Sequence, residues 1–441
     1  MSLFLSKPLS PLNQSARFLE GSIVSTAFDI ANRARELAAD FQGRRHAWMV
    51  RSSQASDVFG ALLLCESLQL PLVICHTHLP TEQVREIQES QRVGAVIHPH
   101  MQIERLPETT DQKGQESVFS ILLMTSGTTG KPKIARHSPL HLLGRMRLVK
   151  SDPPAKWLLT YPPTTFAGVQ VLLTAVLSGS ELICPQNYDI FSLAQSAEEL
   201  NVSHISGTPT FWRSLLVALG ATSKLPALRH VTLGGEISDQ ATLNRIRQRF
   251  PSARIAHIYA STEAGSLFSV HDGKAGFPSA WLEEGVDGTA LSVRDDVLWV
   301  RSPRRMLEYA SDHEALMSQG GWLCTGDRVK IDENRVYFVG RSDQIVNIGG
   351  SKVSPADVEA VILQVEGVSD VIVRAVRNPI TGFVLAADIV ADRGVDQNVL
   401  RRLIVSHCRR SLSDFQIPRM IRFLSASMQS YSGKKLTGEK T

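Results

Sequence analysis

Apolar residues recur at two spacings along the chain, and the spacing predicts which segments are helices and which are strands. Residues 27–40 and 54–68 carry apolar side chains at helical spacing, whereas residues 70–75 and 93–97 are short apolar runs typical of buried strands. Because strands that alternate with helices favour parallel sheets with helices on their faces, the pattern predicts an α/β fold.

The same alternation continues beyond these segments. It predicts strands at 157–161, 181–184, 204–207, 230–233 and 254–258, and helices at 169–177, 191–200, 211–219 and 239–249. Around residues 290–302 the period changes to two, which predicts a small antiparallel sheet.

A change of pattern near residues 340–342 predicts a domain boundary. Ser354 followed by Pro355 indicates a helix start, with the serine hydroxyl as N-cap and the proline at the first helical position. A helix at 356–366, strands at 368–376 and 383–390, a helix at 398–412 and a strand at 420–424 complete the order. We therefore expect a large N-terminal domain of helix-covered sheets with a small antiparallel β region, residues 1–340, and a small α+β domain, residues 341–441.

Composition and charge narrow the class of protein. With 441 residues, 43% of them hydrophobic and 20% charged, the chain is expected to form two or three globular domains. No apolar run approaches the roughly 18 residues of a membrane helix, and the N-terminus is unlike a signal peptide, so we expect no membrane insertion. Five scattered cysteines without a CxxC pair favour free thiols in the cytoplasm. A net charge of +4 does not indicate nucleic-acid binding.

The segment from Thr125 to Lys133 carries the strongest chemical signal. It follows the apolar strand 121–124 and combines four hydroxyl side chains, two glycines and two lysines within nine residues. Glycines allow the backbone to approach a ligand closely, and amides, hydroxyls and lysines together form a cradle for an anion. The P-loop of NTPases does not fit, because Pro132 follows Lys131 and Gly127 lies only three residues before Gly130.

This segment resembles the phosphate-binding loop of the adenylate-forming superfamily, which includes acyl-CoA synthetases, peptide-synthetase adenylation domains and beetle luciferases. Six further motifs of the superfamily follow in its usual order: Gly234-Gly235-Glu236, Tyr259–Glu263, Thr325-Gly326-Asp327, Gly340–Asp343, Gly349–Lys352 and Ser432-Gly433-Lys434. The resemblance implies an AMP-forming acid–thiol ligase that uses ATP and Mg²⁺.

The resemblance also implies a role for each matching residue. Thr125, Ser126, Gly127, Thr128, Thr129, Gly130, Lys131 and Lys133 would hold the ATP phosphates, and Gly234, Gly235, Glu236, Tyr259, Ala260 and Ser261 would surround the adenine, with Ala260 in place of the usual glycine. Thr262 would bind the α-phosphate, Glu263 the Mg²⁺, and Asp327 and Arg341 the ribose. Lys434 would bridge the reacting carboxylate and the AMP. Lys435 leaves this assignment ambiguous by one position, and the family pattern of a lysine directly after glycine selects Lys434.

The second half-reaction and the substrates are expected from the same resemblance. Asp343 would be the hinge of a mobile C-terminal domain, and Gly349 and Gly350 would line the tunnel of the thiol, which belongs to CoA or to an acyl carrier protein. Candidate residues of the acyl pocket are Thr165, Phe166, Val169 and Gly207. Residues 161–168 contain no carboxylate to pair with an α-ammonium group, so the expected substrate is an aryl or short-to-medium acyl acid, not a free amino acid. A degenerate member that binds nucleotide without turnover, and oxidative light emission, remain as alternatives.

Overall fold

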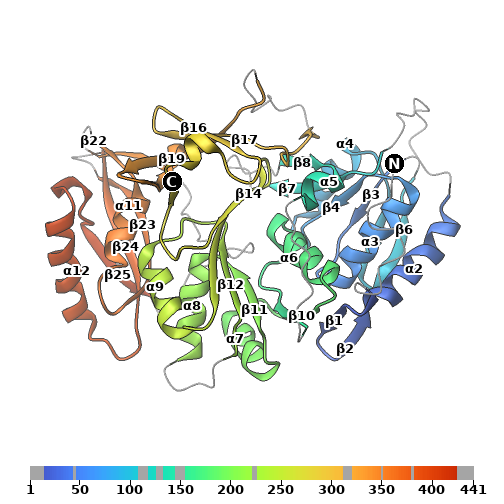
Figure 1. Ribbon diagram of the computed structural model, residues 1–441, viewed down its shortest axis with the longest axis horizontal. Coiled ribbons are helices and arrows are strands. Elements are labelled where there is room, and N and C mark those ends of the chain that lie inside the picture. Colours follow the sequence, from blue (N-terminus) through green and yellow to red (C-terminus); the bar gives the residue numbers. More distant parts are fainter. Residues whose placement is uncertain are drawn as a thin grey trace.

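Two mixed sheets with parallel centres form the larger part of the computed structural model (Figure 1). The structure describes residues 14–42, 46–107, 118–125, 133–144, 154–220, 226–310, 320–348, 351–378 and 382–424. Within these ranges the first sheet has eight strands in the order β14-β13-β12-β11-β9-β10-β1-β2. Their bounds are β1 Arg17–Glu20, β2 Ile23–Thr26, β9 Lys156–Leu158, β10 Glu181–Cys184, β11 His204–Gly207, β12 His230–Gly234, β13 Arg254–Ser261 and β14 Gly265–Val270.

The second sheet has seven strands in the order β18-β8-β7-β4-β3-β5-β6 among the described residues. Their bounds are β3 Ala47–Val50, β4 Leu72–Ile74, β5 Val93–His98, β6 Gln102–Arg105, β7 Ile121–Thr125, β8 Lys133–His137 and β18 Glu308–Tyr309. In the eight-stranded sheet the inner pairs are parallel and the two outermost pairs are antiparallel. In the seven-stranded sheet β7, β4, β3 and β5 are parallel neighbours, and the pairs β18–β8, β8–β7 and β5–β6 are antiparallel. The predicted helix-covered parallel sheets are therefore confirmed for the centres of the sheets, and the antiparallel edges are an addition to the prediction.

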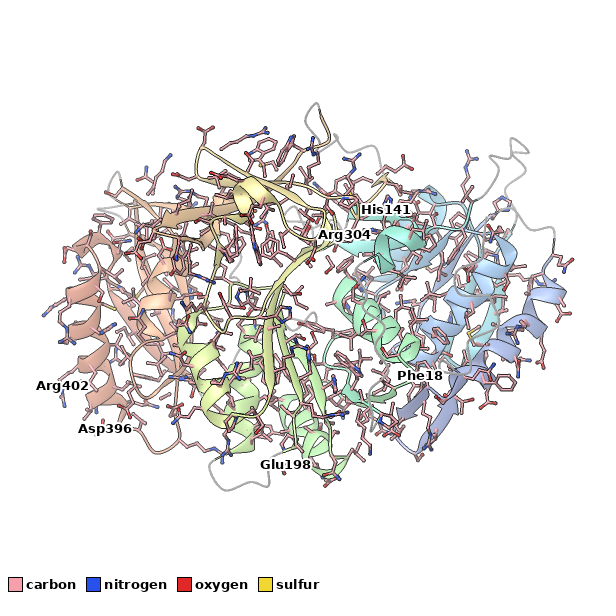
Figure 2. The ribbon with its side chains drawn as sticks, viewed as in Figure 1. Phe18, His141, Glu198, Arg304, Asp396 and Arg402 are labelled. Atoms are coloured by element: carbon pink, nitrogen blue, oxygen red, sulfur yellow. The ribbon has the colours of Figure 1, made fainter. Side chains whose placement is uncertain are left out.

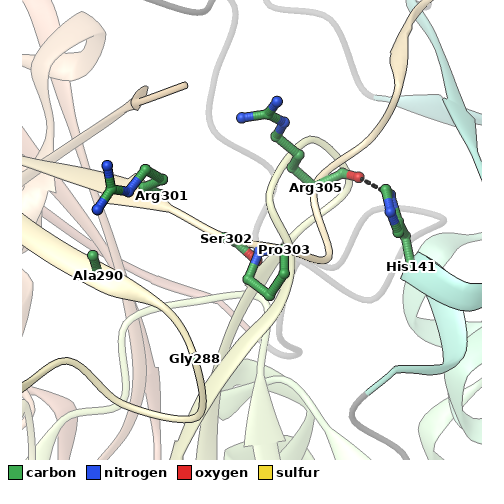
Figure 3. Close-up of a pocket in the computed structure, with 7 residues that line it drawn as sticks. All are labelled: His141, Gly288, Ala290, Arg301, Ser302, Pro303 and Arg305. Atoms are coloured by element: carbon green, nitrogen blue, oxygen red, sulfur yellow. Dashed lines mark hydrogen bonds between the residues drawn. The ribbon is translucent and has the colours of Figure 1, made fainter. Parts of the chain in front are cut away.

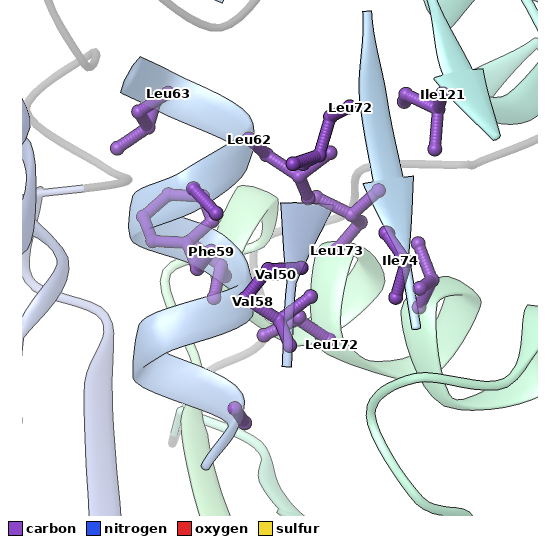
Figure 4. Packing of buried hydrophobic residues seen from close by; sticks show 14 of the residues in the cluster. Val50, Val58, Phe59, Leu62, Leu63, Leu72, Ile74, Ile121, Leu172 and Leu173 are labelled. Carbon is purple, nitrogen blue, oxygen red and sulfur yellow. The ribbon is translucent and has the colours of Figure 1, made fainter. Parts of the chain in front are cut away.

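The helices of this part lie against the two sheets (Figure 1). They are α2 Ala27–Asp40, α3 Ala55–Leu68, α4 Thr81–Ser90, α5 Pro139–Leu143, α6 Phe166–Leu177, α7 Ile190–Glu199, α8 Pro209–Leu219 and α9 Gln240–Arg249. Helix α3 is buried on nearly every side, because its apolar residues surround the helix and do not form a stripe. Figure 4 shows Phe59 and Leu62 of α3 packed with Leu172 of α6 and with strand residues.

A five-stranded sheet in the order β15-β20-β19-β17-β16 matches the predicted antiparallel region within the described ranges. Its strands are β15 Phe277–Pro278, β16 Ala290–Arg294, β17 Val297–Arg301, β19 Leu323–Asp332 and β20 Arg335–Arg341, and the short helix α10, Trp281–Glu284, packs near β16. Phe268, Phe277 and Trp281 form its aromatic core.

The C-terminal unit, residues 346–424, has a hydrophobic core of its own and lies at one end of the molecule (Figure 1). It contains the hairpin β21 Val346–Ile348 and β22 Ser351–Val353, the sheet β23 Val368–Asn378, β24 Gly382–Ala391 and β25 Met420–Leu424, and helices α11 Pro355–Ile362 and α12 Gln397–Ser411. These elements agree with the predicted α+β order. The position of the boundary near residue 340 stays a prediction.

The predicted N-cap of the first C-terminal helix is wrong in its chemistry. Ser354 does occupy the N-cap position of α11, but its side chain makes no capping hydrogen bond. The hydroxyl donates to the carbonyl oxygen of Val339 at 2.6 Å instead. Gly340, with a φ of +116°, lies so close that a Cβ atom there would be 2.7 Å from Ser354 Oγ. The serine is therefore used to join the helix to β20 and not to cap the helix.

Other elements differ from the prediction at their ends. The strand expected at 157–161 stops at Leu158, and neither β1 nor the edge strands β2 and β14 were predicted. Short edge strands carry too few residues to establish a period. Within the described residues, no helix is both long and apolar enough to span a membrane.

Candidate active site

Three predicted site residues from different segments form one chain of hydrogen bonds. Tyr259, near the carboxyl end of β13, donates from its hydroxyl to Asp327 Oδ2 at 2.5 Å. Arg341, the last residue of β20, donates from Nη1 to Asp327 Oδ1 at 3.3 Å. Asp327 and Arg341 face each other across the β19–β20 pair, which fixes their register. The antiparallel sheet thus brings a carboxylate and a guanidinium to the tyrosine of the eight-stranded sheet.

The electrostatics of this group follow from burial and from the shared carboxylate. Burial and the adjacent Asp327 carboxylate raise the pKa of Tyr259 well above its ordinary value, so the phenol stays protonated and donates. The Tyr259 ring packs on Phe338 with 4.7 Å between the ring centroids. A carboxylate accepts hydrogen bonds at both of its oxygens, and this is the acceptor chemistry that the two hydroxyls of a ribose require.

Arg341 also joins this group to the predicted hinge. Its Nε donates to Asp343 Oδ1 at 3.1 Å, and its Nη1 also reaches the carbonyl oxygen of Thr325 at 3.3 Å. Asp343 lies in a short 3₁₀ turn, Ser342–Gln344, directly after β20. The predicted ribose and hinge residues are therefore connected through one guanidinium.

Glu263, the predicted metal ligand, lies two residues after β13. Its Oε1 accepts a hydrogen bond from the Tyr309 hydroxyl at 3.1 Å, and its carbonyl oxygen accepts from the Met306 amide at 2.8 Å. Lys133, from the end of the phosphate-binding segment, places Nζ 5.5 Å from the centroid of the Tyr309 ring. Sequence reasoning missed Tyr309, since a strand of two residues carries no periodic signal.

The glycine-rich turn after β12 is held by two neighbours. The carbonyl oxygen of Gly234 accepts from the Tyr161 hydroxyl at 3.4 Å. The Glu236 carboxylate accepts from the amide and the hydroxyl of Thr210, at 3.1 and 2.7 Å. Gly207, Gly234 and Tyr259 lie at or near the carboxyl ends of parallel strands, the edge where α/β sheets bind ligands.

The four candidate residues of the acyl pocket have different surroundings. Thr165 caps helix α6, because its Oγ1 accepts from the Gly168 amide at 3.0 Å. Phe166 is partly buried against His137, with 5.9 Å between ring centroids, and Val169 is fully buried in the largest hydrophobic core. Gly207 faces the Phe211 ring, which a Cβ atom would approach to 2.1 Å.

Several predicted residues lie outside the described residues. They are Ser126, Gly127, Thr128, Thr129, Gly130, Lys131, Gly349, Gly350, Lys434 and Lys435. Thr125 and Lys133 are described, and they pair with each other at the base of the hairpin formed by β7 and β8. Thr125 is buried, and Lys133 is partly exposed.

The donors around Glu263 fit a magnesium ion that is carried mainly by a nucleotide. No group of three or more His, Cys, Asp or Glu side chains suited to a metal occurs in the part of the chain that the structure describes. Mg²⁺ in ATP-using sites commonly takes one or two carboxylates and completes its shell with phosphates and waters. A single carboxylate oriented by a tyrosine hydroxyl fits that arrangement.

A separate cavity lies between α5 and the antiparallel sheet (Figure 3). It has a volume of about 490 Å³ and is lined by His141, Gly288, Ala290, Arg301, Ser302, Pro303 and Arg305. None of the predicted site residues lines it. We therefore place the candidate site at Tyr259, Asp327 and Arg341 and not in this cavity.

The fold and the residues gathered between its sheets define the class of adenylate-forming enzymes. The chain belongs to the family of AMP-binding enzymes, because the model of that family matches residues 35–296 and the model of the AMP-binding enzyme C-terminal domain matches residues 357–434. The expected superfamily is confirmed, and so is the expected class, an AMP-forming acid–thiol ligase.

Individual relatives are more distant. The chain is 29% identical over 343 residues to a 4-coumarate–CoA ligase-like 4 from Oryza sativa subsp. japonica. The matched residues make up 71% of this chain and 61% of that relative. It is 29% identical over 361 residues to a 2-succinylbenzoate–CoA ligase from Bacillus pumilus (strain SAFR-032), covering 74% and 72% of the two chains. A crystal structure of the anthranilate CoA ligase AuaEII in complex with anthranoyl-AMP superimposes with a TM-score of 0.78 at 18% identity, covering 95% of this chain and 92% of that one.

Proposed function

We propose that the protein activates an aryl or short-to-medium acyl acid with ATP, forming an acyl-AMP, and then transfers the acyl group to the thiol of CoA. The observation that carries this proposal is the convergence of Tyr259, Asp327 and Arg341. Tyr259 and Asp327 are hydrogen-bonded although they are 68 positions apart in the sequence, and Arg341 reaches the same carboxylate from 14 positions away. An aromatic ring beside a carboxylate and a guanidinium suits a nucleoside. The names of the CoA ligase relatives support the choice of acceptor.

In the first step a carboxylate oxygen of the acid attacks the α-phosphorus of ATP. The new oxygen–phosphorus bond forms as the bond to the β-phosphate breaks, and pyrophosphate leaves. Two anions approach each other in this step, so the protein contributes mainly by positioning and by stabilising charge. Asp327 and Arg341 would hold the ribose, Thr262 the α-phosphate and Lys434 the reacting oxygens. Mg²⁺ held by Glu263 would neutralise phosphate charge.

In the second step the thiol sulfur attacks the acyl carbonyl carbon. The carbon–oxygen bond to AMP breaks, AMP leaves, and the thiol proton passes to solvent. We propose that residues 341–441 form a domain that rotates at Asp343 between these steps. Five unpaired cysteines, four of them buried, support a reducing cytoplasmic location.

The test is a screen of pyrophosphate exchange and hydroxamate formation across aryl, short-chain and medium-chain acids. At least one acid is expected to support exchange that depends on ATP and Mg²⁺. Asp327→Ala should abolish that exchange, whereas Asp332→Ala, an exposed residue at the other end of β19, should not change it. ATP binding without exchange for any acid would instead identify a degenerate nucleotide-binding member.

The acceptor is tested with the best acid from the screen. Formation of acyl-CoA with free CoA supports the proposal. Acylation of a holo acyl carrier protein in preference to CoA would move the acceptor to a carrier, because both present the same phosphopantetheine thiol.

A further inference from the structure

The segment from Ser302 to Ala310 connects the antiparallel sheet to the edge of the seven-stranded sheet. Arg304, buried near the centre of the molecule (Figure 2), donates from Nε to the Ser266 carbonyl at 2.8 Å and from Nη2 to the Leu267 carbonyl at 3.2 Å. These bonds hold the start of the segment against β14. These bonds therefore fix the start of the segment five residues before Tyr309.

The end of the segment is held by β8, the strand that leaves the phosphate-binding loop. The Leu307 amide donates to the Arg136 carbonyl at 2.7 Å, and the Ala310 amide donates to the Ile134 carbonyl at 2.8 Å. Tyr309 lies between these two bonds and faces Ala135 in the strand register. The backbone of Tyr309 is thus fixed to the base of the loop.

From this position the Tyr309 side chain contacts two groups with separate predicted roles. Its hydroxyl donates to Glu263 Oε1 at 3.1 Å, and its ring lies 5.5 Å from Lys133 Nζ. An ammonium at this distance is attracted to the face of an aromatic ring. The hydrogen bond orients a flexible glutamate through one oxygen and leaves Oε2 to a cation.

We propose that Tyr309 is a positioning residue for acyl-AMP formation, whose hydroxyl orients Glu263 toward the divalent cation of ATP and whose ring holds Lys133 at the base of the phosphate-binding loop. The proposal rests on the proposed function, because it takes from there the roles of Glu263 and Lys133. Tyr309 acts through these two side chains and not on the reacting atoms. Groups that orient a metal ligand commonly change metal affinity when they are removed.

The test uses Tyr309→Phe, which keeps the ring beside Lys133 and removes the donor to Glu263. Mn²⁺ binding is titrated by the electron paramagnetic resonance signal of free Mn²⁺, with the full-length protein and a non-hydrolysable ATP analogue. We expect the affinity for Mn²⁺ to fall about tenfold. The Mg²⁺ concentration for half-maximal pyrophosphate exchange should rise by a similar factor, while the KM of the acid is unchanged.

Tyr337→Phe is the matched control, because Tyr337 lies on β20 with an exposed side chain. It should keep the wild-type metal titration. Thermal unfolding without metal measures the folded fraction of each variant, and the Mn²⁺ affinities are compared per folded protein.

A double-mutant cycle separates positioning from a general structural role. Glu263→Gln should weaken Mn²⁺ binding, and adding Tyr309→Phe to it should cause no further loss, because the hydroxyl acts through the carboxylate. Additive losses, or a wild-type Mn²⁺ affinity in Tyr309→Phe, would overturn the inference. A wild-type protein that shows no Mg²⁺-dependent exchange with any acid would overturn the proposed function instead, so the two failures are distinguishable.

Discussion

Arg213 on α8 and Asp370 on β23 form a buried ion pair that joins the C-terminal unit to the eight-stranded sheet's helices. Arg213 Nε lies 2.8 Å from Asp370 Oδ1, although the residues are 157 positions apart in the sequence. Their side chains are only 3% and 4% exposed. Arg213 also reaches Asp239 Oδ2 at 3.2 Å and Thr210 Oγ1 at 2.8 Å. Thr210 in turn binds Glu236, so the contact between the domains continues to the glycine-rich turn.

Asp370→Asn is expected to destabilise the protein. Burial lowers the pKa of Arg213, but the carboxylates of Asp370 and Asp239 raise it more, so the guanidinium stays charged and requires a partner. Because Asp239 remains, the loss should fall below the roughly 3–5 kcal/mol typical of a broken buried pair. Urea denaturation measures it. Asp414→Asn, which breaks the exposed pair with Arg419, is the control and should cost less than about 1 kcal/mol.

The same Asp370→Asn variant should affect the two half-reactions unequally. In the present orientation β22 lies at the outer edge of the molecule, away from β12 and β14 (Figure 1). The ion pair therefore stabilises an arrangement in which the hairpin of β21 and β22 is remote from the candidate site. We expect pyrophosphate exchange to fall more than thioester formation from a supplied acyl-AMP. Equal losses in the two assays would show that the pair supports folding alone.

Tyr259→Phe is expected to weaken the use of ATP while the ring is retained. The substitution removes the 2.5 Å hydrogen bond to Asp327. A hydrogen bond to a charged group contributes about 1.5–3 kcal/mol, so kcat/KM for ATP should fall at least about tenfold. The KM of the acid should stay near its wild-type value. A change in the acid's KM without a change for ATP would place Tyr259 on the acyl side of the site.

Lys434→Ala should impair the first half-reaction and leave the second intact. Pyrophosphate exchange is expected to fall by about two to three orders of magnitude, because a positive charge is lost where the new bond forms. Thioester formation from a supplied acyl-AMP should be spared. Lys435→Ala should retain exchange. The reverse result for the two lysines would show that the motif is displaced by one position.

Acidification below pH 6.5 should destabilise the protein through a histidine pair at the amino ends of β11 and β12, the ends opposite Gly207 and Gly234. His204 and His230 face each other on β11 and β12, with parallel rings 5.6 Å apart, and the Trp157 ring lies tilted against His204 with 4.8 Å between the ring centroids. Burial, then the neighbouring His230 and Arg229, lowers the pKa of His204 to about 3. Burial, then Arg254 and His271, lowers the pKa of His230 to about 4.

The sign of the effect follows from these lowered values. The folded state favours neutral imidazoles, so their contribution is complete above the unfolded pKa near 6.5 and is lost as pH falls toward 4 and 3. After allowance for partial exposure, we expect a loss on the order of 1 kcal/mol per histidine between pH 7 and pH 5. Chemical denaturation of His204→Phe/His230→Phe should show a smaller decrease over this range than the wild type. An identical decrease in both proteins would contradict the assignment.

Local pattern alone determined most of the elements and the order of the motifs. The strands Glu181–Cys184, His204–Gly207 and Met420–Leu424 have the predicted bounds. Glu181–Cys184 shows the reason most clearly, because three consecutive apolar residues record a buried strand. The family was also readable from the sequence, since its motifs are contiguous segments such as Thr125–Lys133 and Tyr259–Glu263. Helix spacing and motif identity both depend on neighbours along the chain.

Only the tertiary structure decided which side chains meet. Tyr309 reaches Glu263 from a strand of two residues, and Arg213 reaches Asp370 from another part of the chain, so neither pair is recorded in a local period. Ser354 stands at a position that the sequence predicts to be an N-cap. Its hydroxyl instead donates a hydrogen bond to the Val339 carbonyl oxygen, because helix α11 packs against the end of β20. Such contacts depend on how sheets and domains pack against one another, and residues adjacent in sequence do not specify that packing.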